Sequence, residues 1–344
     1  MTLYTEKIQP EGESSSSVLL EMMYGYIIPQ AVYVAAKLGI ADILSNGAKT
    51  TDEIAKAAEV NSQIIYHLMR MLVSVGVFSG EDNGKFGLNS LGKHLLTGTS
   101  DSLRATVIAM GGLLYPVWSN LLSTTKTGEP AFESIFKMSF YDYLKENSES
   151  AANFNEWMKE TTREWLVPVI EAYDFSEVKT LVDVGGGTGS LTSVILKANP
   201  KMQAILFDRE DGVVGAEGVL EAAGVTNRCQ IVVGNFFESV PPSGDLYLLS
   251  RILLNWDDTQ AMKIIKNCHQ VMKPEDRLML IDVILPEGKM SPLLGIANLN
   301  LFLLGINFIR TEEEFCNLLS SGGFKVINTS KTTGIITVLE AKPA

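Results

Sequence analysis

Cysteine is scarce in this chain, and the few cysteines form no pattern. The sequence holds three, Cys229, Cys268 and Cys316, which lie far apart and include no CxxC pair. An odd number of dispersed cysteines predicts neither a disulfide framework nor a zinc site. We therefore expect reduced thiols, no bound metal and a cytoplasmic location.

Positive charge is also in short supply. Lys and Arg together number 28 against 40 Asp and Glu, which gives a formal net charge of −12. Proteins that bind the phosphate backbone need clustered positive charge. The composition therefore argues against nucleic acid as a partner.

Long uninterrupted apolar runs are missing as well. Residues 18–44 contain Glu21, Lys37 and Asp42, and residues 292–309 contain three asparagines. A membrane-spanning helix needs about 20 consecutive, mainly apolar residues, so we expect two buried helices and no membrane partner. Residues 1–17 carry acids and a serine run instead of a basic stretch before an apolar core, which predicts a flexible tail and not a signal peptide.

The chain up to residue 177 is predicted to be mainly helical. Three helices are predicted, over 31–44, 50–60 and 62–80. The helical spacing of apolar residues or a Thr/Asp cap indicates each of them. The stretches KFGLN (85–89) and GKHLL (92–96) predict a small hairpin, so residues 40–96 resemble a winged helix. A DNA-binding role is one interpretation, but the second helix offers only His67 and Arg70 as contacts. We favour a module that packs against a second subunit through the apolar stretch 18–44, which predicts a homodimer.

After residue 178 short apolar runs alternate with helical segments. Predicted strands cover 180–184, 203–208, 229–233, 245–249 and 277–285, with helices at 190–200, 212–223 and 258–272. This alternation is typical of an α/β fold with a doubly wound, Rossmann-like sheet. Ligand sites in such sheets lie at the carboxyl ends of the strands.

Three consecutive strand ends carry residues suited to an adenosine. The first strand ends in DVGGGTGS (183–190), where Gly185 and Gly187 allow close approach of the backbone and Ser190 replaces the third glycine of a dinucleotide fingerprint. Asp208 ends the second strand and suits a ribose, while Asn235 and Phe236 after the third suit an adenine. Each residue alone also fits a turn, a helix cap or the core, but together they favour an adenosine site.

The chain also resembles a known family. The stretches VAAKLGIADIL, TGEPAFESIF, VDVGGGTG, ILFDRE, GNFFESVP, LYLLSRILLNWDD, RLMLIDVILP and IRTEEEF are similar in order and spacing to small-molecule O-methyltransferases that use S-adenosylmethionine, of the plant caffeate and bacterial natural-product type. The resemblance implies a small-molecule acceptor held between two domains. It implies a winged-helix-like dimerisation domain over 18–110, a helical linker and acceptor-pocket segment over 111–177, and a Rossmann-like cofactor domain over 178–344.

Specific site residues follow from this resemblance. It implies that the cofactor contacts Gly185, Gly187, Asp208, Asn235, Phe236, Ser250 and Arg251. It implies that the acceptor pocket is lined by Trp118, Phe154, Met158, Trp165, Leu254, Asn300, Leu301 and Ile309. The aromatic and methionine residues among them also fit simple core packing.

The chain departs from the family where the base should be. The family pattern His-Asp-Trp-x-Asp is here Leu254-Asn255-Trp256-Asp257-Asp258, so a leucine occupies the slot of the base. Of the two acids that accompany the histidine, one is matched by Asp282 and the other is replaced by Ile309. Asp282, beside apolar residues, is expected to have a raised pKa and is a candidate proton acceptor.

The missing base narrows the chemistry. Orientation of two reactants contributes about 7 to 11 kcal/mol, and a general base adds about 10²- to 10⁴-fold. Without the base, methylation of a phenol with a pKa near 10 would be slower, because only about one part in a thousand of the phenol is ionised at pH 7. We therefore expect methyl transfer to nitrogen or carbon of an apolar natural product, or to an acidic oxygen. The alternatives are a rearrangement, cyclisation or hydroxylation on the same fold, or a binding protein without chemistry.

Overall fold

The computed structural model describes residues 15–80, 83–332 and 334–344. The chain forms two compact units, the first ending at Glu160 and the second beginning at Thr161. The domain boundaries at residues 110 and 177 stay predictions.

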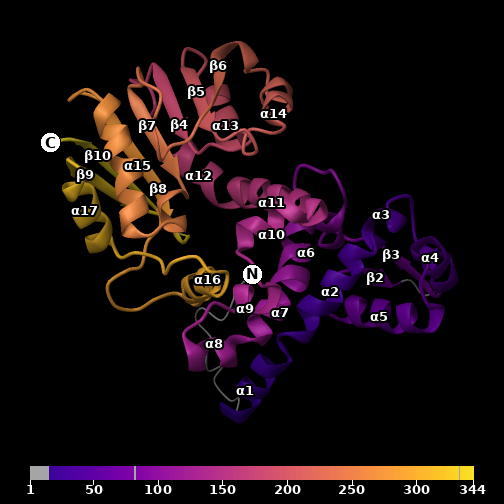
Figure 1. The fold of residues 1–344 in the computed structure, drawn as a ribbon. Coiled ribbons are helices and arrows are strands. Elements are labelled where there is room, and N and C mark those ends of the chain that lie inside the picture. The colour runs from indigo at the N-terminus through magenta and orange to yellow at the C-terminus, as the bar shows by residue number, and fades with distance from the viewer. Residues whose placement is uncertain (1–14, 81–82, 333) are drawn as a thin grey trace. The chain divides into compact units, whose positions relative to one another are not determined.

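The described part of the first unit is built from short helices (Figure 1). Thr50 and Glu53 form a capping box at the start of α4, and Asn61 caps α5 by accepting from the Ile64 N–H at 3.0 Å. The expected single helix over 31–44 is two helices because Gly39 adopts a left-handed φ of 65° between them. The helices are α1 (Ser15–Tyr24), α2 (Ile27–Lys37), α3 (Ile40–Leu44), α4 (Thr51–Ala58), α5 (Ser62–Ser74), α6 (Arg104–Ile108), α7 (Leu114–Ser119), α8 (Leu121–Thr127), α9 (Ala131–Phe136), α10 (Phe140–Glu146) and α11 (Ser148–Thr161), which crosses the boundary, with a π-helical turn at Ala109–Leu113.

A small antiparallel sheet completes the winged-helix module. Its strands are β1 (Lys49–Thr50), β2 (Ser79–Gly80) and β3 (Lys85–Gly87), in the order β1-β3-β2. The expected partner strand at 92–96 is wrong, because Gly92–Leu95 forms a 3₁₀ helix. The Asn89 side chain stabilises that turn by accepting from the Gly92 N–H at 2.8 Å and donating to the Gly76 carbonyl at 2.9 Å.

The expectation that residues 18–44 form a buried helix holds for only part of that stretch. Ala35, Ala36 and Ile40 are buried in the core of the module, but α1 has no buried residue. Leu19, Met23 and Tyr24 on α1 are each about 60% exposed. By length and composition alone, the helical stretch Ser15–Lys37 is long and apolar enough to cross a membrane.

The second unit contains a sheet in which seven strands are described, in the order β6-β5-β4-β7-β8-β10-β9. β4 to β8 are parallel, and β10 and β9 add an antiparallel edge that the sequence analysis did not foresee. The strands are β4 (Thr180–Val184), β5 (Gln203–Asp208), β6 (Cys229–Val233), β7 (Leu246–Ser250), β8 (Arg277–Val283), β9 (Phe324–Lys331) and β10 (Ile336–Pro343). The predicted Rossmann-like sheet is confirmed.

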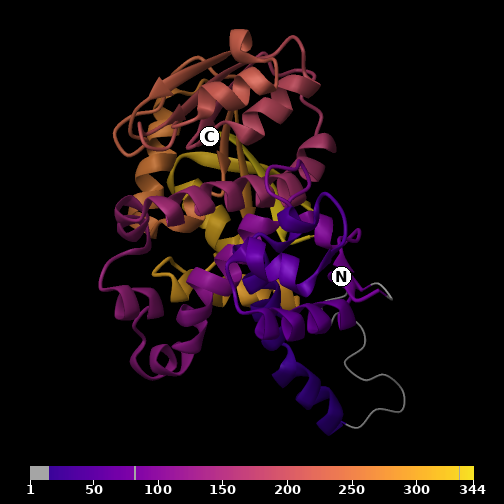
Figure 2. The same cartoon turned by 90° about the vertical axis from the view of Figure 1, so that its right-hand side faces the viewer.

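Helices cover both faces of this sheet (Figures 1 and 2). Successive strand residues point to opposite faces, so Leu181 packs with α12, α13 and α14 while Val182 packs with α15 and α17. The helices are α12 (Val167–Glu171), α13 (Ser190–Ala198), α14 (Ala216–Ala222), α15 (Asp258–Val271), α16 (Pro292–Leu303) and α17 (Glu312–Ser321), with a π-helical turn η3 (Thr162–Leu166) and 3₁₀ turns η4 (Thr226–Arg228) and η5 (Leu253–Asn255). The expected burial of α16 is partly wrong, since only Leu294 and Leu303 of this helix are buried.

Candidate active site

The turn between β4 and α13 is built from glycines in left-handed conformations. Gly185, Gly187 and Gly189 have φ of 79°, 57° and 74°, which other residues adopt only with strain. A Cβ on Gly185 would lie 2.4 Å from Cδ1 of Ile252, so no other residue fits there without a shift. The turn ends at the N-terminus of α13, whose first N–H groups have no partner within the helix.

Asp208 ends β5 beside this turn. Its Oδ2 accepts from the Gly187 N–H at 2.8 Å and its Oδ1 accepts from the Arg209 N–H at 2.7 Å. Burial raises the pKa of Asp208, against the opposing effect of these two hydrogen bonds. Each carboxylate oxygen keeps a further lone pair, so a ribose hydroxyl has an acceptor here.

Two buried oxygens near these strand ends lack partners within the described chain. Asp183 is 1% exposed, and its Oδ2 accepts from the Thr192 hydroxyl while Oδ1 has no partner. Burial, with a smaller contribution from the neighbouring Asp208, raises the pKa of Asp183 to about 6 against the opposing effect of the Thr192 hydrogen bond. The Ser250 hydroxyl at the end of β7 is also unpartnered. Because buried polar atoms are nearly always hydrogen-bonded, both atoms fit a polar ligand at this edge.

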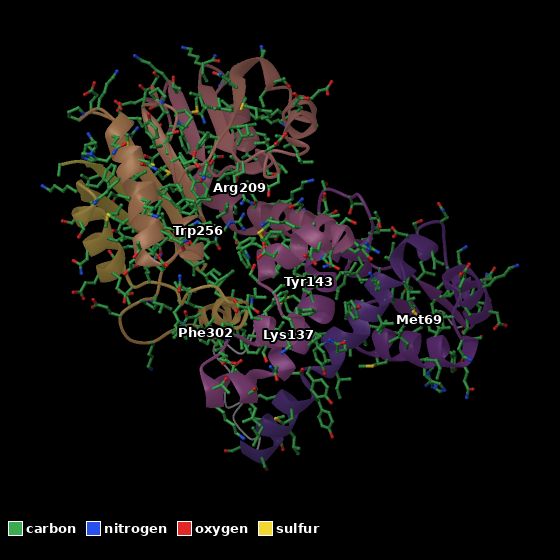
Figure 3. All side chains as sticks on the ribbon, in the orientation of Figure 1. Met69, Lys137, Tyr143, Arg209, Trp256 and Phe302 are labelled. Carbon is green, nitrogen blue, oxygen red and sulfur yellow. The ribbon has the colours of Figure 1, made fainter. Side chains whose placement is uncertain are left out.

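An aromatic cluster joins the end of β6 to the segment after β7. The ring of Phe237 lies edge-on to the rings of Phe236 and Trp256, with centroids 4.8 Å apart in both pairs. Asn235 Oδ1 accepts from the Phe237 N–H at 3.1 Å, and its Nδ2 donates to Glu238 at 2.9 Å. In Figure 3, Arg209 and Trp256 mark this edge of the sheet.

The slot of the missing base is apolar and buried. Leu254 lies in η5 at 8% exposure, and Ile309 is 3% exposed. Asp282 on β8 is 1% exposed and accepts from the N–H groups of Val283, at 2.8 Å, and Leu254. Burial raises the pKa of Asp282 to about 7, although these hydrogen bonds and the more distant Arg310 and Arg251 oppose the shift. Asp282 is therefore a buried carboxyl group with a raised pKa, hydrogen-bonded to the backbone of the segment that carries Leu254.

Arg310 holds the segment that carries Leu254, a role that the sequence analysis missed. Its guanidinium donates to the carbonyls of Leu253 at 2.7 Å and Trp256 at 2.6 Å, and to Asp258 Oδ1 at 2.9 Å. The Arg310 side chain is 7% exposed, so its bonds to the two backbone carbonyls are shielded from water, whereas its partner Asp258 is 81% exposed. The Arg-Thr pair in IRTEEEF marked the position, but no local pattern in the sequence indicates its three partners.

The predicted acceptor residues are distributed over both units. Trp118 lies on α7, and Phe154 and Met158 lie on α11, all in the first unit. In the second unit, Trp165 lies in η3, Asn300 and Leu301 lie on α16, and Ile309 follows that helix. Leu301 packs against the same core cluster that contains Ile309. Trp165 is 39% exposed.

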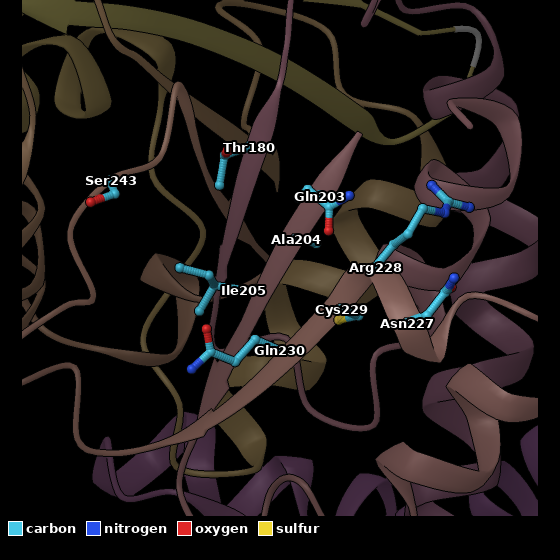
Figure 4. A pocket seen from close by; sticks show the side chains of 9 residues that line it. All are labelled: Thr180, Gln203, Ala204, Ile205, Asn227, Arg228, Cys229, Gln230 and Ser243. Carbon is cyan, nitrogen blue, oxygen red and sulfur yellow. The ribbon is translucent and has the colours of Figure 1, made fainter. Parts of the chain in front are cut away.

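A shallow cavity at the opposite end of the sheet is not part of this constellation. It is lined by Thr180, Gln203, Ala204, Ile205, Asn227, Arg228, Cys229, Gln230 and Ser243 (Figure 4). Gln203 and Cys229 begin β5 and β6, whereas ligands of doubly wound sheets bind at the carboxyl ends. We assign no role to this cavity.

Comparison with known proteins identifies the family. Residues 118–325 match the model of the O-methyltransferase domain, and residues 20–98 match the O-methyltransferase dimerisation domain. The chain belongs to the O-methyltransferase family. It is a methyltransferase, its cofactor is S-adenosylmethionine, and the match to the dimerisation domain, which begins within α1, supports self-association.

Individual relatives are similar over nearly their full length. A phenazine O-methyltransferase from Lysobacter antibioticus is 37% identical, covering 98% of this chain and 99% of its own. A phenazine-1-carboxylate N-methyltransferase from Pseudomonas aeruginosa is 31% identical, covering 90% and 91%. The crystal structure of LaPhzM, 37% identical, superposes with a TM-score of 0.90 over 96% of this chain and all of its own. That of CalO1, a methyltransferase in calicheamicin biosynthesis in its SAH-bound form, is 28% identical, with a TM-score of 0.80 over 96% and 98%.

The strand ends fit the family's cofactor. The turn has open space beside Gly187, Asp208 keeps acceptors for ribose hydroxyls, and Asp183 and Ser250 have unpartnered oxygens. The described residues contain no group of three or more His, Cys, Asp or Glu side chains placed to hold a metal ion. The roles of the single residues stay predictions.

Proposed function

We propose that this methyltransferase acts on a flat, largely apolar natural product, at nitrogen, carbon or an already acidic oxygen, without a histidine base. The observation that supports this proposal is the buried Leu254 in the slot of the base, with the buried Ile309 in place of the family's second acid. When bound, S-adenosylmethionine supplies an electrophilic methyl group. The chain then mainly has to orient the acceptor, which contributes about 7 to 11 kcal/mol in well-aligned reactions.

Asp282 is the remaining candidate for a proton acceptor. Its carboxyl group is 1% exposed and accepts two backbone N–H groups. An acceptor can touch its oxygens only after neighbouring side chains move. We infer that Asp282 at most receives a proton that leaves after methylation, as from an amine, and does not activate a phenol.

The relatives support an acceptor with fused aromatic rings. Of the two relatives described above, one is a phenazine O-methyltransferase and the other a phenazine-1-carboxylate N-methyltransferase. Members of this family thus methylate either atom of similar flat scaffolds. The apolar side chains of Leu254 and Ile309 suit contact with such a ring system better than contact with a hydroxyl group.

We further propose a cytoplasmic homodimer. The support for the dimer is the match of residues 20–98 to the dimerisation domain together with the exposed apolar side chains of α1. Burial of that surface against a second copy also accounts for the apolar stretch Ser15–Lys37 without a membrane.

Incubation with methyl-labelled S-adenosylmethionine and a panel of flat amines, phenols and nitrogen heterocycles tests the function. The expected result is labelled product, with a nitrogen, carbon or acidic-oxygen acceptor preferred to a simple phenol. A modified product without label would instead establish a rearrangement, cyclisation or hydroxylation. Cofactor binding without any product would point to a binding protein.

Substitution of Leu254 tests the missing base. Leu254→His should leave turnover of the preferred acceptor unchanged or lower and should create weak activity on a phenol of similar shape. Leu254→Gln is the matched control, because it adds polarity without a base. A hundredfold gain for Leu254→His on the preferred acceptor would show that the slot had simply lost its base.

A further inference from the structure

Arg251 is held in an unusual backbone conformation directly after β7. Its φ is +56°, in the left-handed region that residues other than glycine adopt at an energetic cost. Its N–H donates to the Ile281 carbonyl at 2.8 Å, and its own carbonyl accepts from Asn255 Nδ2 at 2.9 Å. These two hydrogen bonds therefore fix the backbone of Arg251, and with it the point from which its side chain extends.

The guanidinium of Arg251 binds two consecutive threonines at the start of the second unit. Nη1 donates to the Thr161 hydroxyl at 2.9 Å and Nη2 donates to the Thr162 hydroxyl at 2.8 Å. Thr161 and Thr162 are only 5% and 6% exposed, so water does not readily replace these bonds. Burial lowers the pKa of Arg251 to about 10, which still leaves the group charged at neutral pH.

Thr162 begins a π-helical turn that has a local cause. Pro168 lacks an N–H and its ring crowds the carbonyl four residues earlier, so the regular α-helical ladder cannot run through Glu164. The Val167 N–H instead donates to the Thr162 carbonyl, five residues back. Such π-turns are less stable than α-helix and often occur at functional sites. Trp165, a predicted acceptor contact, lies within this turn at 39% exposure.

We propose that Arg251 is a positioning residue for acceptor binding: through the hydroxyls of Thr161 and Thr162 it fixes the π-turn that presents Trp165. The inference rests on the proposed function, because it takes Trp165 as a wall of the acceptor site. It assigns to Arg251 a role in addition to the predicted cofactor contact. The two N–H donors lie in the rigid plane of the Arg251 guanidinium. They therefore set both the position and the rotation of the turn, which a single ammonium group would not do.

The double variant Thr161→Val, Thr162→Val tests this role because it removes both acceptors and leaves Arg251 in place. We expect the KM of the acceptor to rise at least tenfold while kcat and the dissociation constant of S-adenosylmethionine stay within about threefold. Amide hydrogen exchange over residues 162–167 should accelerate at least tenfold. Thr161→Ser, Thr162→Ser keeps the hydroxyls and should restore both quantities.

Tyr173→Phe is the matched control in the same unit. Its hydroxyl donates to Glu340 at 2.6 Å and accepts from Arg277 at 3.1 Å, so this variant also loses a partly buried hydroxyl, but near the start of β8. An acceptor KM that rises equally in this control would overturn the proposal, as would unchanged exchange over 162–167 in the valine variant. If the wild type transfers no methyl group, the proposed function fails, and hydrogen exchange still decides whether Arg251 orders the turn.

Discussion

Replacement of Asp282 by asparagine should make the stability of the protein less sensitive to pH. Burial raises the pKa of Asp282 from an ordinary value of 3.8 to about 7. The unfolded chain therefore loses this proton at a lower pH than the folded chain does. The stabilising effect of the raised pKa is fully present below about pH 4 and is lost as the pH rises through 7. Asp282→Asn keeps an oxygen that can accept from the Val283 N–H but removes the titration.

The size of this effect on the unfolding free energy follows from the shift in the pKa of Asp282. About three pKa units at 1.36 kcal/mol each correspond to roughly 4 kcal/mol over the whole window. About half of this, roughly 2 kcal/mol, falls between pH 5.5 and pH 8. Over that interval the wild type should lose about 2 kcal/mol of unfolding free energy relative to Asp282→Asn.

Urea titrations of both proteins at the two pH values measure this difference. Ile281→Val is the control, because it perturbs the same strand without a titratable group and should differ from the wild type equally at both pH values. The same free-energy difference between wild type and Asp282→Asn at pH 5.5 and pH 8 would refute the reasoning. Asp282 would then be ionised throughout, held by Arg251 and Arg310.

Three further predictions concern the cofactor, the assembly and the loop at Leu254. Asp208→Ala should weaken calorimetric binding of S-adenosylmethionine at least tenfold, because a ribose hydroxyl loses its acceptor; a change below twofold would remove Asp208 from the cofactor site. Light scattering at low micromolar concentration should give about twice the chain mass of 37.6 kDa, and a clean monomer would contradict the dimer. Arg310→Lys should lower kcat/KM about tenfold, since one ammonium group cannot hold two carbonyls and Asp258 in the same geometry. Unchanged kinetics would show that the segment keeps its shape without Arg310.

Much of the fold was predictable because its signals are local. Alternating apolar runs and helical periods predicted the parallel strands β4 to β8, and the glycines of 185–189 predicted the turn after β4. The helix expected from residue 212 begins only at Ala216, because Gly215 in a left-handed conformation precedes it. The antiparallel edge was missed because no strand was predicted after residue 285, so the pairing of β10 with β8, at Ile336 and Val283, had no predicted partner strand.

The sequence by itself determined which side chains follow each strand, since the order of strands and loops places Asp208, Asn235 and Leu254 at one edge of the sheet. It also determined the family, because the motifs are contiguous. Only the tertiary structure decided how deeply Asp282 is buried, and that Arg310 and Arg251 bind segments 52 or more residues away in the sequence. Burial and long-range hydrogen bonds arise when distant segments pack together, and they leave no periodic trace along the chain from which they could be predicted.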